Sequence, residues 1–170
     1  CGHLNGKQVI PESEMAEKIH AACEGRQSDN TVIIARTDVR GVGSMKDCLS
    51  RIEAYHNAGA DWIFPEALQS QDEFSEAGAL LKELQSTGLA NMTEFGRGPL
   101  LSRETLVAMG FAAVLYPVTL LRLAMKAIEV GLEVLGDEGS QETLLDLMQT
   151  REELYELLDY DPTLGNKKNP

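Results

Sequence analysis

The chain has 170 residues, of which 43% are hydrophobic, and this is enough apolar material to bury a core of ordinary domain size. Its formal net charge of −12 argues against nonspecific binding to nucleic acid or to an anionic membrane surface. No apolar stretch is long enough to span a bilayer, no signal peptide is visible, and the three cysteines show neither metal-type spacing nor a disulfide framework, so the sequence predicts a protein of the reducing cytoplasm.

The first elements alternate between strands and helices. Residues 1–11 are predicted to form a loop, because glycines and a proline interrupt them. Short apolar runs then predict buried strands near residues 32–36, 61–65, 88–92 and 112–116. Amphipathic segments between them predict helices over 11–22, 44–58, 71–85 and 103–109. This βαβα alternation predicts a parallel sheet with right-handed crossovers.

The pattern changes after Pro117. A long helix is predicted over 119–135, and the glycines between 136 and 139 are expected to end it. A second helix is predicted over 141–158, followed by a polar tail at 159–170. We therefore expect helices without further strands in this part of the chain.

Polar residues follow the predicted strands at their carboxyl ends, which is where α/β barrels carry their chemistry. The junctions are Arg36-Thr37-Asp38, Pro65-Glu66, Asn91-Met92-Thr93-Glu94 and Tyr116-Pro117. Eight βα units of this kind would need about 250 residues. Because four are present, the chain is either about half of a barrel or a small open α/β domain.

Each candidate residue has a functional and a structural interpretation. Arg36 can clamp a carboxylate in bidentate fashion, or it can form a surface ion pair with Asp38. Glu66 can act as a base or orient the water of a metal ion, or it can be a turn residue. Asn91 and Thr93 alternate on one segment and can face the same ligand, or they can hydrogen-bond within a loop.

The remaining candidates are weaker when each is taken alone. Cys1-Gly2-His3 places a thiol beside an imidazole, although a cysteine at this position is more often incidental. Arg122 and Arg151 lie on predicted helices, where an arginine usually faces solvent.

The motifs together resemble the isocitrate lyase and phosphoenolpyruvate mutase superfamily. The matching segments are Cys1-Gly2-His3-Leu4, Ala35-Arg36-Thr37-Asp38, Ala58-Gly59-Ala60-Asp61, Phe64-Pro65-Glu66-Ala67, residues 90–96, Leu115-Tyr116-Pro117 and residues 148–155. They cover residues 1–160 in order, and their combination is highly specific. Residues 64–67 and 148–155 resemble the 2-methylisocitrate lyase branch in particular.

The resemblance implies an α/β fold, namely a (β/α)8 TIM-type barrel of which this chain carries roughly the C-terminal half plus C-terminal helices. Residues 1–117 would be the C-terminal part of the barrel, with the active-site loop at 1–11. Residues 118–160 would be helices that make oligomer contacts, and 161–170 a mobile tail. The superfamily's metal-holding aspartates precede the cysteine loop, so we expect a Mg²⁺ cofactor whose ligands lie upstream of this chain.

The implied reaction is Mg²⁺-dependent cleavage of 2-methylisocitrate to pyruvate and succinate. Cys1 would protonate the succinate half, Arg36 would bind the pyruvate side, and Glu66 would lie near the metal's water. The other substrate-binding residues implied by position are Gly2, His3, Asn91, Thr93, Arg122 and Arg151. Phe64 and Leu115 offer an apolar lining that suits the extra methyl group.

Alternatives remain open within and outside this class. Isocitrate, dimethylmalate and oxaloacetate are alternative substrates, because one methyl group in a pocket changes affinity by only about 1–3 kcal/mol. A non-catalytic barrel fragment is the other alternative. The expected partners are a small tricarboxylate substrate and further copies of the chain, in a homo-oligomer that we expect to be a tetramer, with neither nucleic acid nor a membrane involved.

Overall fold

The computed structural model describes residues 6–161. The chain divides into two compact units, one ending at Thr119 and the other beginning at Leu120. Within the part of the chain that is described, no helix is both long enough and apolar enough to cross a membrane.

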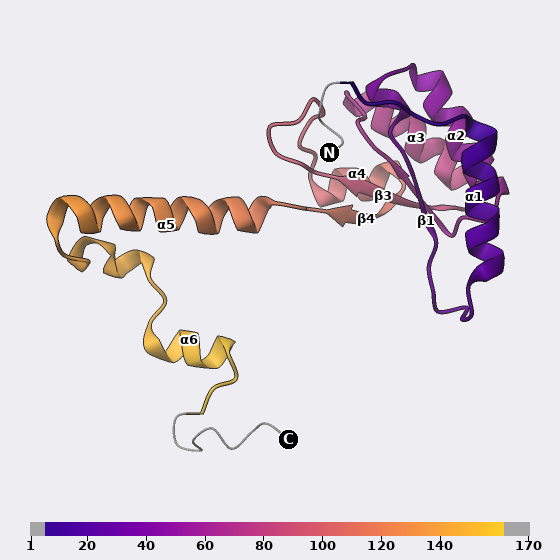
Figure 1. The fold of residues 1–170 in the computed structure, drawn as a ribbon. Helices are drawn as coiled ribbons and strands as arrows, with labels where there is room; N and C mark the ends of the chain where they lie inside the picture. Colours follow the sequence, from indigo (N-terminus) through magenta and orange to yellow (C-terminus); the bar gives the residue numbers. More distant parts are fainter. Residues whose placement is uncertain (1–5, 162–170) are drawn as a thin grey trace. The chain divides into compact units, whose positions relative to one another are not determined.

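The first unit contains a parallel four-stranded sheet with helices between its strands (Figure 1). The strands lie in the order β1-β2-β3-β4, each beside its neighbour in sequence. Their bounds are β1 Ile34–Thr37, β2 Trp62–Pro65, β3 Thr87–Asn91 and β4 Phe111–Leu115. The helices are α1 Glu12–Gly25, α2 Met45–Asn57, α3 Gln71–Glu83 and α4 Arg103–Met109, with a short 3-10 turn, η1, at Val39–Gly41. The predicted parallel α/β sheet is confirmed.

The core lies between the sheet and its helices. Ile52 of α2, Ile63 of β2 and Leu81 of α3 are fully buried there. Each such side chain contributes about 1.5–3 kcal/mol by leaving water. Successive residues of β1 alternate between faces, so that Ala35 is buried in this core while the next residue, Arg36, is exposed. The sheet therefore presents Arg36 on the side opposite the core.

The first strand differs from its prediction in position and in burial. β1 begins at Ile34 and runs through Thr37, about two residues later than the apolar run suggests. Before it, the backbone N–H of Ile33 donates to the Asp61 carboxylate, so a side chain holds this part of the chain. Val32 and Ile34 are 47% and 43% exposed. Ile34 is exposed because it lies on the same face of β1 as Arg36, opposite the core. The prediction of a fully buried strand is wrong here.

The second unit is helical, but its boundaries differ from the predicted ones. Its elements are α5 Thr119–Glu138, the 3-10 helix η2 Glu142–Leu147 and α6 Arg151–Leu157. Gly136 stays inside α5, which ends before Gly139 at a φ of 65°. The predicted helix over 141–158 is wrong, because Thr150 starts a new helix through a capping box with Glu153.

Gly78 of α3 provides a test of how closely the helices pack. A Cβ at this position would collide with the backbone carbonyl oxygen of Met109 at the end of α4. We expect Gly78→Ala to lower the free energy of unfolding by about 1–3 kcal/mol, because backbone atoms cannot move aside. Gly25→Ala is the matched control, since nothing lies within 4 Å of its Cβ. Equal urea midpoints for the two variants would contradict this packing.

Candidate functional site

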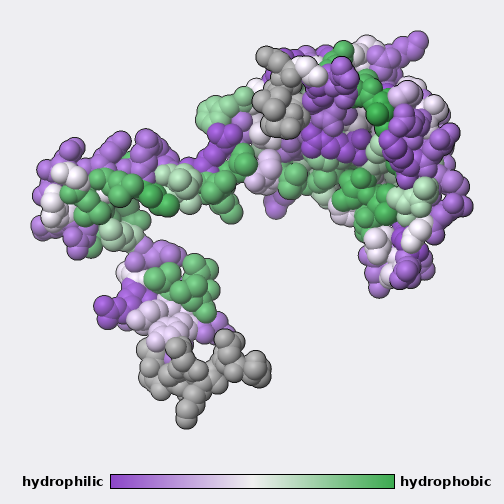
Figure 2. Space-filling model, in the orientation of Figure 1, coloured by the Kyte–Doolittle hydropathy of each residue, from purple (hydrophilic) through white to green (hydrophobic). Residues whose placement is uncertain are grey.

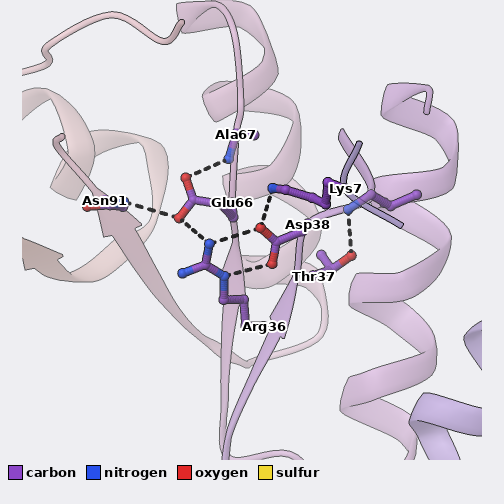
Figure 3. Close-up of polar contacts among 8 residues, drawn as sticks. Lys7, Arg36, Thr37, Asp38, Glu66, Ala67 and Asn91 are labelled. Atoms are coloured by element: carbon purple, nitrogen blue, oxygen red, sulfur yellow. Dashed lines mark hydrogen bonds and ion pairs between the residues drawn. The ribbon is translucent and has the colours of Figure 1, made fainter. Parts of the chain in front are cut away.

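Four polar side chains meet at the carboxyl ends of β1, β2 and β3 (Figure 3). Arg36 Nε and Nη2 donate to Oδ2 and Oδ1 of Asp38 at 2.7 and 2.9 Å. Arg36 Nη2 also lies 3.2 Å from Glu66 Oε2. Asn91 Nδ2 donates to the same Glu66 oxygen at 3.1 Å. The parallel topology explains this convergence, because the strands all end at one edge of the sheet.

Glu66 is a buried carboxylate with partners on both oxygens. Only 4% of the residue is exposed. Its Oε1 accepts from the backbone N–H of Ala67 at 3.1 Å, while Oε2 receives Asn91 and Arg36. Ala67 has a φ of 65°, so the chain turns sharply directly after Glu66. Glu66 therefore supports a turn, as the structural interpretation expects, and it also faces the polar cluster, as the functional interpretation expects.

The ion pair at the end of β1 shifts the pKa of both of its partners. Burial alone would raise the pKa of Asp38, but the hydrogen bonds from Arg36 and Lys7 together with their positive charges outweigh it, and the pKa falls below its ordinary value of 3.8. The hydrogen bond to Asp38 raises the pKa of Arg36, against an opposing effect of burial and with help from the charge of Glu66. The Arg36 guanidinium also lies 4.9 Å from the centre of the Phe64 ring.

A cavity of about 340 Å³ adjoins this cluster. Glu66, Asn91 and Thr93 contribute to its wall, together with Lys7 and Arg97. Cavities of this size commonly hold small-molecule ligands. Arg36 is not part of this wall, but it borders a neighbouring open cleft and contacts the cavity through Glu66.

Asn91 carries an unsatisfied acceptor at this position. Its amide nitrogen donates to Glu66, whereas its Oδ1 is buried and has no hydrogen-bond partner among residues 6–161. An unpaired buried oxygen costs about 1–3 kcal/mol. A bound molecule that donates a hydrogen bond would remove this cost.

The remaining predicted residues fall in three groups. Cys1, Gly2 and His3 lie outside the described residues. Phe64 is 7% exposed on β2, and Leu115 is 40% exposed at the end of β4, and neither contributes to the wall of the cavity. Arg122 on α5 and Arg151 at the start of α6 belong to the second compact unit.

Sequence reasoning did not identify Lys7 and Arg97 as residues of this site. Lys7 Nζ lies 2.6 Å from Asp38 Oδ1, although the two residues are thirty-one positions apart. No local pattern around residue 7 signals that contact. Arg97 stands between two glycines in the loop after β3, and this Gly-Arg-Gly segment is a signal that could have been used.

Cys48 is excluded as a reactive thiol in this region. It is fully buried in the core behind the sheet. Burial raises the pKa of its thiol to about 12, so the reactive thiolate is scarce at neutral pH. A thiol that takes part in chemistry must therefore come from another position.

Whether the described residues can bind Mg²⁺ depends on the ligand atoms that they offer. Mg²⁺ prefers oxygen ligands and keeps several waters. Within the described range there is no group of three or more His, Cys, Asp or Glu side chains that could hold a metal ion. Glu66 and Asn91 nevertheless place a carboxylate and an unpaired amide oxygen beside the cavity. These two residues fit contacts to metal-bound water, and they do not form a complete ligand set.

Comparison with known sequences gives a consistent result. The sequence model of the phosphoenolpyruvate phosphomutase family matches residues 2–135. The 2-methylisocitrate lyase of Halalkalibacterium halodurans is 46% identical over 169 residues, which are 99% of this chain and 55% of that protein. The 2-methylisocitrate lyase of Bacillus subtilis is 46% identical over 160 residues, or 94% of this chain and 52% of that protein. The chain thus spans about half the length of the curated relatives it matches.

Solved structures agree with the sequence comparison. Oxaloacetate acetylhydrolase in complex with 3,3-difluorooxalacetate superposes with a TM-score of 0.78 at 30% identity, over 99% of this chain and 58% of that one. Phosphonopyruvate hydrolase with oxalate and Mg²⁺ shares the fold, with a TM-score of 0.72 at 23% identity over 93% of this chain and 56% of that one. These neighbours are TIM-type barrels, so the four-stranded sheet is part of such a barrel, as predicted.

Proposed function

This chain belongs to the phosphoenolpyruvate phosphomutase family, and from that premise we propose that the whole protein is a carbon–carbon lyase that cleaves 2-methylisocitrate to pyruvate and succinate. The convergence of Arg36, Glu66 and Asn91 beside one cavity is the observation that carries the proposal. Lys7 and Arg97 add positive charge there, although the chain as a whole is acidic. Cationic side chains at the wall of a cavity suit a substrate with three carboxylates.

The proposed reaction breaks one carbon–carbon bond of the substrate. A base removes the proton of the hydroxyl group, the carbon–carbon bond breaks, and pyruvate forms from the oxygen-bearing half. The bonding electrons remain on the succinate half as an aci-carboxylate. Cys1 then gives its thiol proton to that carbon, and the product is succinate. The proton lost from the hydroxyl and the proton gained by carbon balance over the cycle.

Arg36 is the residue to which we assign the pyruvate carboxylate. Its Nε and Nη2 are occupied by Asp38 and Glu66, whereas Nη1 takes part in none of these contacts. This leaves one edge of a fixed guanidinium for a bound anion. Phe64 supports the plane of the group from one side.

The other assignments follow from the position of each residue in the family's motifs. Asn91 and Thr93 line the cavity, and we assign them to the succinate carboxylates together with Gly2 and His3. Arg122 and Arg151 belong to the second unit and stay predictions of the resemblance alone. Glu66 and Asn91 would contact the water of Mg²⁺, which when bound supplies a Lewis acid for the developing carbonyl of pyruvate.

Steady-state kinetics on a panel of substrates test this function. The whole protein, assayed with Mg²⁺, is expected to turn over 2-methylisocitrate with kcat/KM at least about tenfold above that for isocitrate, the effect of one well-placed methyl group. 2,3-Dimethylmalate and oxaloacetate complete the panel, because solved structures of enzymes for these substrates resemble this chain. A preference for either of them would replace the substrate assignment, and inactivity on all four would favour a non-catalytic protein.

We further propose that the second unit assembles copies of the protein into a homotetramer in the cytoplasm. Figure 2 shows apolar side chains gathered along α5. Leu121, Ile128 and Leu132 are 61%, 54% and 66% exposed in the single chain. Exposed apolar surface of this extent commonly marks a protein interface.

A single charge on this surface should disrupt the assembly. We expect the whole protein to have the mass of a tetramer in light scattering and Leu132→Glu to give smaller species, because a charge buried in an interface costs several kcal/mol. Ala127→Glu is the control, as it adds the same charge at another exposed position of α5. A monomeric wild type, or a Leu132→Glu variant of unchanged mass, would refute the interface.

A further inference from the structure

Lys7 forms an ion pair that is shielded from solvent. Its Nζ lies 2.6 Å from Asp38 Oδ1, and the two side chains are only 14% and 22% exposed. Lys18 and Glu14 lie equally close, at 2.6 Å, but are 57% and 48% exposed. Solvent screens an exposed pair almost completely, whereas a shielded pair interacts strongly. Lys7 is therefore expected to affect its surroundings far more than Lys18 does.

The pair belongs to a chain of alternating charges, drawn in Figure 3. Asp38 Oδ1 accepts hydrogen bonds from both Lys7 Nζ and Arg36 Nη2. Arg36 in turn bridges Asp38 and Glu66. Two cations thus face two carboxylates within one connected cluster. Without the ammonium group, Arg36 would be the single cation between two carboxylates, and the cluster would carry a net negative charge.

This balance determines how well the guanidinium can attract a further anion. A cluster that is neutral overall admits a carboxylate beside Arg36 Nη1, whereas a net negative cluster repels it. We propose that Lys7 is a positioning residue of this site: by neutralising Asp38, it keeps the Arg36 guanidinium available to the carboxylate of a small 2-oxo acid. The inference rests on the proposed function only for the assignment of Arg36 to the pyruvate carboxylate.

Binding of pyruvate alone tests the inference without requiring turnover. In calorimetry on the whole protein with Mg²⁺, Lys7→Met should weaken pyruvate binding about tenfold, the loss expected when a charge-assisted contact is removed. Lys7→Arg keeps the charge and should bind within about threefold of wild type. Lys18→Met removes an equally close but exposed pair and should leave the affinity unchanged.

A second substitution separates charge balance from a general structural role. Asp38→Asn removes the negative charge that Lys7 neutralises and leaves an oxygen that accepts from Arg36. The double variant Lys7→Met/Asp38→Asn should therefore recover most of the affinity that Lys7→Met loses. If Lys7 serves only to stabilise the fold, the second substitution adds damage and lowers the affinity further, and that result would overturn the proposal.

The outcomes also separate this inference from the proposed lyase activity. A protein that binds pyruvate through Arg36 but does not cleave 2-methylisocitrate loses its proposed function, while the test of Lys7 still proceeds. If the protein does not bind pyruvate, or if Arg36→Lys binds it as tightly as wild type, Arg36 does not hold the pyruvate carboxylate. Either result overturns the proposal for Lys7. If Lys7→Met fails to fold, the affinity of Lys7→Met/Asp38→Asn relative to Lys7→Arg decides the question.

Discussion

Replacing Cys1 with serine should lower kcat for 2-methylisocitrate by about a thousandfold, within the range that general acid catalysis contributes. A serine hydroxyl is a far weaker acid than a thiol, whose ordinary pKa is about 8.5. The aci-carboxylate would therefore still form, but its protonation would be slow. KM should change little, because the two side chains have nearly the same shape and no binding contact is assigned to the sulfur. The kinetic constants of the whole protein measure both effects.

Cys23→Ser provides the matched control, since it makes the same atomic exchange elsewhere in the chain. Cys23 donates its thiol hydrogen to the backbone oxygen of Gly59 at 3.1 Å, and a serine hydroxyl can make the same hydrogen bond. We expect this variant to retain wild-type kinetics. If Cys1→Ser kept a kcat near that of wild type, the cysteine would have no part in proton transfer.

Replacing Arg36 with lysine should reduce kcat/KM by about a hundredfold or more, because charge-assisted hydrogen bonds of roughly 1.5–3 kcal/mol each are lost. Arg36 uses Nε and Nη2 to hold Asp38 and still reaches Glu66 with Nη2. An ammonium group is a single point and cannot contact both carboxylates and a substrate in these positions. In contrast to Cys1→Ser, this substitution should raise KM and lower kcat together.

Arg103→Lys is the matched control for this prediction. Arg103 also pairs with a carboxylate, with Nε and Nη2 at 3.2 and 2.9 Å from Glu104 Oε1, but its side chain is 76% exposed. An exposed pair contributes about 0–1 kcal/mol, and its loss should not affect turnover. Equal kinetics for Arg36→Lys and Arg103→Lys would show that the guanidinium at residue 36 does not bind the substrate.

The repeated apolar runs were sufficient to predict the parallel sheet. A buried parallel strand needs an uninterrupted apolar segment, and its carboxyl end must meet solvent where polar residues resume. For this reason, Arg36, Glu66 and Asn91 could be identified as neighbours from their places at three strand ends. The topology then positions them, because consecutive parallel strands end at the same edge.

The remaining features depend on contacts that no local pattern contains. The exposure of Ile34 follows from its place on the face of β1 opposite the core, which it shares with Arg36. The pair between Lys7 and Asp38 joins residues far apart in sequence. The start of α6 is a different case, since the capping box between its N-cap Thr150 and Glu153 is visible in the sequence as Thr-x-x-Glu. This capping motif indicates the helix boundary more reliably than the helical periodicity of residues 141–158 does.

Product analysis in heavy water tests the central claim most directly. The whole protein is incubated with 2-methylisocitrate and Mg²⁺ in D2O, and the products are followed by NMR. The proposed reaction predicts equal amounts of pyruvate and of succinate carrying one deuterium, because the thiol exchanges with solvent before it protonates the carbon. Recovery of intact 2-methylisocitrate, while isocitrate or another member of the substrate panel is cleaved under the same conditions, would contradict the assignment.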